Sequence, residues 1–124
     1  MENTVTLITG SAKRIGAYTA KYLHSFGSNI VVHCNQSRLE AEKLCIELNQ
    51  IRAKSAMLVQ GDLSDLSSIE RIGQQAIDSF GRLDVLINNA GANWSAPFSE
   101  YPEKGYDAAG RELLTLLHIS THQR

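Results

Sequence analysis

The feature that most constrains this chain is a regular alternation of short apolar runs with longer amphipathic segments. Apolar or β-branched runs at residues 4–9, 30–32, 56–59 and 85–87 have the length of buried strands. Between them, residues 15–26, 38–52 and 65–80 repeat apolar side chains at helical spacing. Strands that alternate with helices in this way pair in parallel through right-handed crossovers. The sequence therefore predicts an α/β fold with a parallel sheet in the strand order 3-2-1-4.

Turn-forming residues support these boundaries. Gly27 and Gly81 follow the first and third helical segments, where a glycine can adopt the positive φ of a helix C-terminus, and Ser64 or Asp65 can cap the third. Beyond residue 91 the pattern loosens. We therefore expect residues 1–91 to form a nucleotide-binding half, and residues 92–124 a loop and an atypical tail whose leucines are compatible with a short helix.

Composition excludes several classes of protein. With 43% hydrophobic residues, 20% charged residues and a net charge of -1, the chain is typical of one soluble domain, with no electrostatic footprint for nucleic acid or an anionic membrane. No signal or membrane segment precedes the first strand, which predicts a cytoplasmic protein. Cys34 and Cys45 form no CxxC pair, and His118 and His122 lack a third ligand, so we expect free thiols and no metal site.

Residues 9–16, with the sequence TGSAKRIG, lie where the first strand gives way to the first helix. At this place a doubly wound fold binds pyrophosphate on free backbone N–H groups. One glycine would permit the tight turn and the other would let the helix lie close to the sheet; an ordinary glycine turn is the alternative. The candidate cofactor-binding residues here are Gly10, Lys13, Arg14, Ile15 and Gly16.

The end of the second strand indicates which dinucleotide would bind. A site that prefers NAD places a carboxylate about 20 residues beyond the glycines, where it hydrogen-bonds the ribose 2′-OH. Residues 33–38, HCNQSR, contain no carboxylate, and Glu40 comes later, inside the helix. NADP(H) is therefore favoured, because a 2′-phosphate could meet a helix start and several basic groups. The candidates are His33, Ser37 and Arg38, with Lys13 and Arg14 across the cleft; a backbone carbonyl could instead satisfy His33, and Arg38 could be a solvated helix start.

Two motifs carry a resemblance to a known family. The glycine segment resembles the TGxxxGxG of short-chain dehydrogenases/reductases, with Arg14 in place of the middle glycine, and residues 88–91 match their NNAG signature residue for residue. The form TGxxKRIG, and the His-x-x-x-Ser spacing of His33 and Ser37, are similar to the pteridine reductases of that superfamily. The resemblance extends from Thr4 to about Asp107.

This resemblance implies the N-terminal part of a Rossmann-type doubly wound sheet. It also implies that Asp62 accepts a hydrogen bond from the adenine amino group while Leu63 flanks the ring, although Asp62 could instead cap the third helix. The small NNAG residues would let the cofactor ribose approach the backbone, with asparagines tying neighbouring strands together; the residues concerned are Asn89, Ala90 and Gly91. Full-length relatives of this kind transfer hydride from NADPH to a pterin or a carbonyl substrate.

The catalytic signature of the family is absent from these residues. Its members donate a proton from a tyrosine whose pKa is lowered by a lysine four residues later, and no Tyr-x-x-x-Lys occurs here. We therefore expect a C-terminally truncated relative with no reductase activity, whose fourth strand is an apolar edge that promotes self-association. A non-catalytic nucleotide-binding module and a non-functional fragment are the alternatives.

Overall fold

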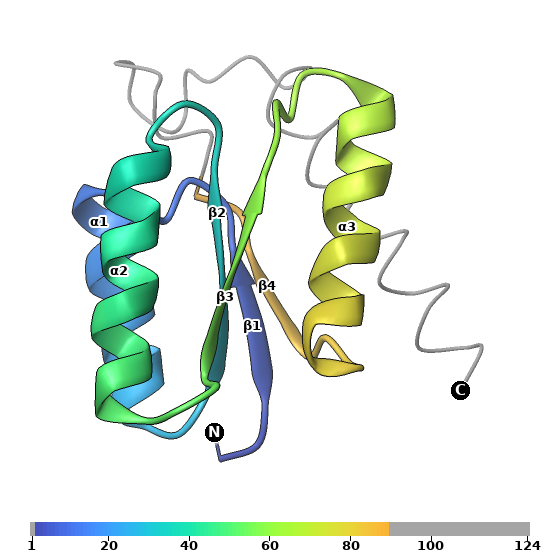
Figure 1. The fold of residues 1–124 in the computed structure, drawn as a ribbon. Helices are drawn as coiled ribbons and strands as arrows, with labels where there is room; N and C mark the ends of the chain where they lie inside the picture. Colours follow the sequence, from blue (N-terminus) through green and yellow to red (C-terminus); the bar gives the residue numbers. More distant parts are fainter. Residues whose placement is uncertain (1, 90–124) are drawn as a thin grey trace, which may run out of the picture.

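The computed structural model describes residues 2–89 and forms a parallel sheet with helices on both faces (Figure 1). The strands lie in the order β3-β2-β1-β4, and every pair is parallel. This confirms the predicted fold class and strand order. The elements in chain order are β1 (Val5–Ile8), α1 (Arg14–Ser25), β2 (Asn29–Cys34), α2 (Arg38–Ile51), β3 (Ala56–Gln60), α3 (Leu66–Phe80) and β4 (Val85–Ile87).

Side chains of the central strands alternate between two hydrophobic clusters, because successive residues of a strand point to opposite faces. On β2, Ile30, Val32 and Cys34 belong to the cluster beneath α1 and α2, whereas Val31 belongs to the cluster beneath α3. The two helices α1 and α2 cover one face of the sheet, and α3 covers the other (Figure 1). Burial on both faces explains why β1 and β2 read as nearly continuous apolar runs.

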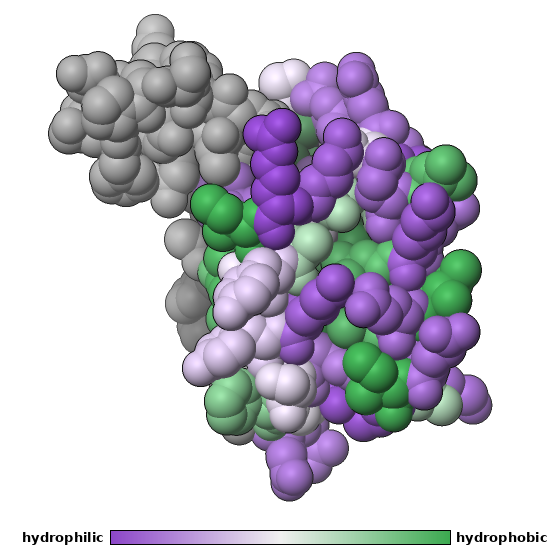
Figure 2. Space-filling view, turned by 90° about the vertical axis from the view of Figure 1, so that its left-hand side faces the viewer, coloured by the Kyte–Doolittle hydropathy of each residue, from purple (hydrophilic) through white to green (hydrophobic). Residues whose placement is uncertain are grey.

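The buried face of α1 differs from the apolar spacing seen in the sequence. Gly16, Ala20 and His24 are buried, whereas Ile15 and Tyr22 are 70% and 56% exposed. Small residues let this helix lie close to the sheet, so the large side chains point outward. Figure 2 looks at the side of the molecule that carries α1 and α2, where hydrophobic side chains are interspersed with hydrophilic ones at the surface.

The helix ends agree with the expected turn residues. Gly27 and Gly81 have φ values of 102° and 77°, the left-handed conformation expected after a helix. Asp65 occupies the N-cap position of α3. The interpretation of Asp62 as the cap of that helix is therefore wrong, because three residues separate it from the helix start.

Several other expectations concern the described part of the chain. Both cysteines are free thiols, as predicted. Within residues 2–89, no helix has both the length and the apolar character needed to span a bilayer. Among the described strands, β4 is paired with β1 alone, and its role in self-association stays a prediction. The expected loop and tail at 92–124, and the motif residues Ala90 and Gly91, lie outside the described residues.

Candidate cofactor site

The candidate site lies at the carboxyl ends of the parallel strands. Four segments that follow β1, β2, β3 and β4 emerge at this same edge of the sheet, which is where open α/β sheets bind ligands. These segments are residues 9–13, 35–37, 61–65 and 88–89. The described candidate residues lie in these segments, at the starts of α1 and α2, or, for His33, near the end of β2.

Two glycines shape the loop between β1 and α1. Gly10 has a φ of 63°, in the left-handed region that a side chain disfavours. A Cβ added to Gly16 would stand 2.6 Å from the carbonyl oxygen of Gly10 and 2.7 Å from Nδ2 of Asn89. Contacts this short would force the backbone apart. The tight turn and the close approach of α1 expected from the sequence are both present.

Arg14 stands where the family pattern has its middle glycine, and its backbone is also left-handed, with a φ of 56°. For an L-residue this conformation costs about 1–2 kcal/mol relative to the right-handed one. The position therefore keeps the glycine conformation although the residue is arginine. Its side chain and that of Lys13 are both exposed at the start of α1.

The N-terminus of α1 has no side-chain cap. Lys13, in the N-cap position, is extended and makes no capping hydrogen bond through its side chain. The first N–H groups of a helix lack intrahelical partners and carry the positive end of its dipole. Together with the cations of Lys13 and Arg14, they make this turn electrostatically favourable for a phosphate group.

The residues after β4 are tied to the glycine loop through side chains. The hydroxyl of Thr9 donates to Oδ1 of Asn88 at 3.1 Å and accepts from the backbone N–H of Asn89 at 2.9 Å. The side-chain amide of Asn89 donates to the carbonyl of Gly10 at 3.2 Å. The expectation that the asparagines tie neighbouring strands together is confirmed for the strands β1 and β4.

His33 has a different place from the one expected beside a 2′-phosphate. Its side chain is buried, with the residue only 2% exposed, and both ring nitrogens have protein partners. Nδ1 accepts from the backbone N–H of Gly10 at 2.9 Å, and Nε2 lies 2.9 Å from the carbonyl oxygen of Gly61. Desolvation lowers the pKa of this imidazole below its ordinary value of 6.5. A buried, doubly bonded neutral ring cannot serve as an open cationic partner for phosphate, so the interpretation of His33 as bonded to a backbone carbonyl is correct.

Ser37 and Arg38 mark the start of α2, as expected. Ser37 is the N-cap residue and makes no capping hydrogen bond through its hydroxyl. The guanidinium of Arg38 donates to Glu42 at 2.8 Å and to the side-chain oxygen of Gln60 at 2.7 Å. The arginine is thus held toward β3 by protein partners.

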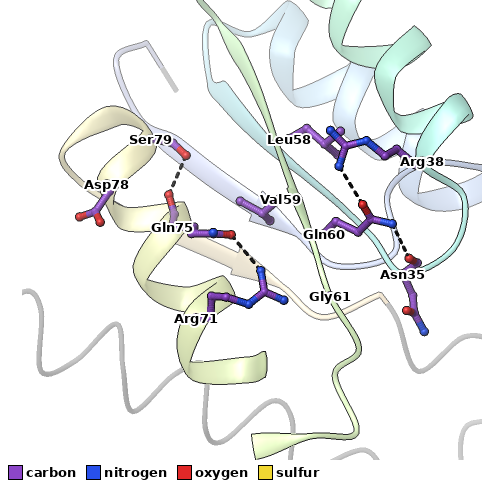
Figure 3. A pocket seen from close by; sticks show the side chains of 10 residues that line it. All are labelled: Asn35, Arg38, Leu58, Val59, Gln60, Gly61, Arg71, Gln75, Asp78 and Ser79. Carbon is purple, nitrogen blue, oxygen red and sulfur yellow. Dashed lines mark hydrogen bonds between the residues drawn. The ribbon is translucent and has the colours of Figure 1, made fainter. Parts of the chain in front are cut away.

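A pocket of about 780 Å³ lies beside the end of β3, between the start of α2 and one side of α3 (Figure 3). Arg38 and Arg71 line it from the two helices, and Gln60 lies between them. Gln60 is anchored by its amide, which donates to the carbonyl of Asn35 at 2.9 Å. The pocket therefore borders the segment after β2 and is lined mainly by polar side chains.

Asp62 and Leu63 follow β3 and differ in their surroundings. Asp62 is exposed, and its Oδ1 accepts from both the backbone N–H and the hydroxyl of Ser64, at 2.9 and 2.8 Å. These two bonds hold the pKa of the carboxyl below its ordinary value, so it is an ionised acceptor at neutral pH. Leu63 is half-buried and packs against the cluster beneath α3.

Ser11 is a structural member of this site that the sequence pattern did not single out. It is fully buried, its N–H donates to the carbonyl of His33 at 3.0 Å, and its hydroxyl accepts from the N–H of His33 at 3.1 Å. The signal available in the sequence was a small hydroxyl residue directly after Gly10. This reciprocal pair extends the contact between β1 and β2 into the glycine loop.

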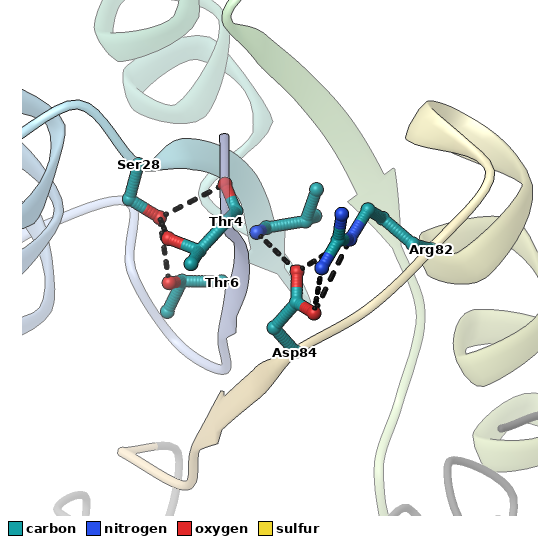
Figure 4. A network of polar contacts seen from close by, with 6 residues as sticks. Thr4, Thr6, Ser28, Arg82 and Asp84 are labelled. Atoms are coloured by element: carbon teal, nitrogen blue, oxygen red, sulfur yellow. Dashed lines mark hydrogen bonds and ion pairs between the residues drawn. The ribbon is translucent and has the colours of Figure 1, made fainter. Parts of the chain in front are cut away.

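At the amino ends of the strands, opposite the candidate site, a separate network of polar contacts joins the strands (Figure 4). There Asp84 accepts from the backbone N–H of Val5 at 2.8 Å and pairs with Arg82 at 2.6 Å. The hydroxyls of Thr4 and Thr6 both bond to that of Ser28. This network is satisfied internally and joins β1 to its neighbours, so its role is structural.

Comparison with known proteins decides the family. The family model for short chain dehydrogenases matches residues 4–110, which include the glycine loop and the segment after β4. The chain belongs to the short-chain dehydrogenase family. Members of this family bind a nicotinamide dinucleotide, either NAD or NADP.

Individual relatives agree with this assignment. The chain is 35% identical over 107 residues to the short chain dehydrogenase mdpC of Emericella nidulans, covering 86% of this chain and 40% of that protein. It is 35% identical to an uncharacterised oxidoreductase of Methylorubrum extorquens, with 86% and 42% covered. A hydroxynaphthalene reductase-like protein of Metarhizium brunneum is 29% identical, with 83% and 38% covered. The chain thus spans about two fifths of the length of these short-chain dehydrogenase relatives.

Proposed function

We propose that this chain is the NADP(H)-binding half of a short-chain reductase. The observation that carries the proposal is the joined loop at the carboxyl ends of β1 and β4, in which Asn89 bonds to Gly10 and Gly16 packs against both. This close packing brings the N-terminus of α1 against the glycine loop, and a Cβ at Gly16 would push the two apart.

The residues present fit a dinucleotide along this edge of the sheet. The diphosphate would be held by the first N–H groups of α1 together with Lys13 and Arg14. The adenine end would lie toward Asp62, whose carboxylate is ionised and exposed, and Leu63. A bound nicotinamide would supply the hydride for the reduction that full-length relatives carry out, and these residues would hold the dinucleotide.

Preference for the 2′-phosphate follows from the charges around α2. The segment after β2 holds no carboxylate, and Ser37 leaves its hydroxyl outside any capping bond. The helix start adds unpartnered N–H groups, and Lys13 and Arg14 add positive charge. Glu40 lies in the first turn of α2 and opposes them as an exposed carboxylate. Arg38 contributes through its charge, since its guanidinium already bonds to Glu42 and Gln60.

The substrate class is proposed from the resemblance, as a pterin or a carbonyl compound. TGxxKRIG and the spacing of His33 and Ser37 support a pterin, while a similar protein is described as hydroxynaphthalene reductase-like. Residues 1–124 contain no Tyr-x-x-x-Lys, so we propose that they bind the cofactor without reducing a substrate themselves. A nucleotide-binding module without catalysis is therefore the second candidate function.

The proposal is tested by mapping NADP⁺ onto the chain with amide NMR. We expect saturable shifts at residues 13–16 of the glycine loop and at residues 37–39, and none of comparable size at Lys54 or Gly81, which lie far from the candidate site. Absence of saturable shifts in a folded sample would contradict the proposed function. Shifts restricted to residues 13–16 would leave a dinucleotide site but contradict recognition of the 2′-phosphate by α2.

A further inference from the structure

Two loops of the candidate site are held together by one buried imidazole. Nδ1 of His33 accepts the N–H of Gly10, so the proton of the neutral ring must be on Nε2, which then donates to the carbonyl of Gly61. The two distances are each 2.9 Å. A single ring, in one tautomer, therefore links the glycine loop to the segment after β3.

These two loops would serve different ends of a dinucleotide. The glycine loop lies at the proposed diphosphate position, and the segment after Gly61 carries Asp62 and Leu63 at the proposed adenine position. We propose, on the basis of the proposed function, that His33 is a positioning residue that sets the separation of these two subsites and holds Gly10 in its left-handed conformation. The imidazole acts through the backbone and does not itself contact the cofactor.

Protonation of His33 would break this link. An imidazolium has hydrogens on both nitrogens and no acceptor, so the N–H of Gly10 would lose its partner in a buried place. Burial lowers the pKa of the ring, which keeps it neutral at pH 7. Dinucleotide affinity should therefore fall when the solution is acidified enough to protonate His33.

Other titratable groups on the surrounding elements are separate from the ring. Within the described residues, the two ring nitrogens bond to backbone groups of Gly10 and Gly61. The titratable groups on the surrounding elements are Lys13 and Arg14 at the glycine loop, Cys34 on β2, Arg38, Glu40 and Glu42 on α2, Asp62 after β3 and Arg71 on α3. Of these, Cys34 is buried, Glu42 is half-buried and the rest are exposed. A change centred on the titration of His33 can therefore be assigned by observing its own ring resonances.

The ligand-free chain gives the first test, with ¹⁵N NMR of the histidine rings and of the Gly10 amide. We expect a protonated Nε2 and an unprotonated Nδ1 at pH 7, and a Gly10 amide resonance that shifts with the same midpoint as His33, below pH 6.5. The opposite tautomer, or a Gly10 resonance that ignores the titration of His33, would overturn the proposal. This readout is independent of any nucleotide.

The second test measures NADPH affinity in matched variants. His33→Phe keeps a buried ring but removes both hydrogen bonds, and should weaken binding by about tenfold or more. His33→Gln, whose amide can accept and donate, should restore affinity to within about threefold of the original chain. Equal affinity of His33→Phe and the original chain would contradict the positioning role, as would a failure of His33→Gln to restore any binding in a folded sample.

His24 provides the control, because it is a second buried histidine and lies toward the amino ends of the strands, opposite the candidate site. It is 1% exposed, and its Nε2 lies 2.6 Å from the hydroxyl of Ser55. His24→Phe should lower stability without changing NADPH affinity; an equal affinity loss would show that the His33 effect is only structural. If the original chain binds no NADPH, the proposed function fails, and the NMR titration alone decides whether His33 holds Gly10.

Discussion

The side-chain amide of Asn89 donates to the carbonyl oxygen of Gly10, and this bond joins two motifs that are 79 positions apart in the sequence. Gly16 packs against the same two residues at distances that leave no room for a methyl group. The region therefore tolerates little change in shape. The small residues Gly10 and Gly16 set how closely α1 and the glycine loop pack.

Gly16→Ala should damage both folding and binding. The new Cβ would meet the backbone of Gly10 at 2.6 Å, and overpacking of this kind costs about 1–3 kcal/mol, more than the helix propensity gained. We expect a lower free energy of unfolding in urea and NADPH binding weakened by about tenfold or more.

Gly81→Ala is the matched control for that variant. Gly81 also has a positive φ, but a Cβ added there would meet no other atom within 4 Å, so only backbone strain of about 1–2 kcal/mol is expected. Its NADPH affinity should equal that of the original chain. Unchanged affinity in Gly16→Ala as well would contradict the role assigned to close packing at Gly16.

Arg14→Gly should separate stability from binding. Glycine relieves the strain at φ 56°, which after the entropy of the unfolded chain is counted should raise the free energy of unfolding by about 0.5–1 kcal/mol. Loss of the positive charge should weaken NADPH binding. Lys54 also has a positive φ, of 58°, and precedes β3. Lys54→Gly should therefore raise the free energy of unfolding without changing NADPH affinity. Equal NADPH affinity in the two variants would show that Arg14 has no part in binding.

Features that depend on residues close together in the sequence could be predicted, whereas contacts between distant residues could not. The strand order, the turn at Gly10 and the close packing at Gly16 follow from local patterns, and all three are present. For His33 the sequence allowed a backbone carbonyl as partner, which the contact with Gly61 bears out, but it predicted neither that residue nor the bond from Gly10. These partners are 23 and 28 positions away, and only the folded backbone brings them together. The buried face of α1 was missed for a related reason: small residues, rather than large apolar ones, allow close contact with the sheet.

Stability should decrease as the pH falls below about 6.5. Burial lowers the pKa of both His24 and His33, and the charge of Arg52 adds to this for His24. The unfolded chain therefore binds more protons, so the stabilisation is complete above pH 6.5 and is lost as the pH falls through the lowered folded-state values. Urea unfolding between pH 8 and 5 should show a slope of up to about 1.4 kcal/mol per pH unit for each proton taken up. A flat profile would contradict the burial of neutral rings.

Residues 1–124 should show no reductase turnover, even in samples that bind NADPH. Positioned general-acid catalysis contributes a factor of about 10² to 10⁴, and these residues contain no Tyr-x-x-x-Lys to supply it. With dihydropterin, quinone and ketone substrates, the NADPH absorbance should fall no faster than in a control without protein. Tyr101 precedes Lys104 by three residues, one fewer than the family spacing. Protein-dependent oxidation that disappears in Tyr101→Phe would therefore reveal an unexpected proton donor.

The central claim is that this chain binds a dinucleotide and recognises its 2′-phosphate. Calorimetric titration of one folded sample with NADPH and with NADH tests it most directly. Phosphate contacts of about 1.5–3 kcal/mol predict that NADPH binds roughly 10- to 150-fold more tightly. Equal affinity, or tighter binding of NADH, would contradict the claim.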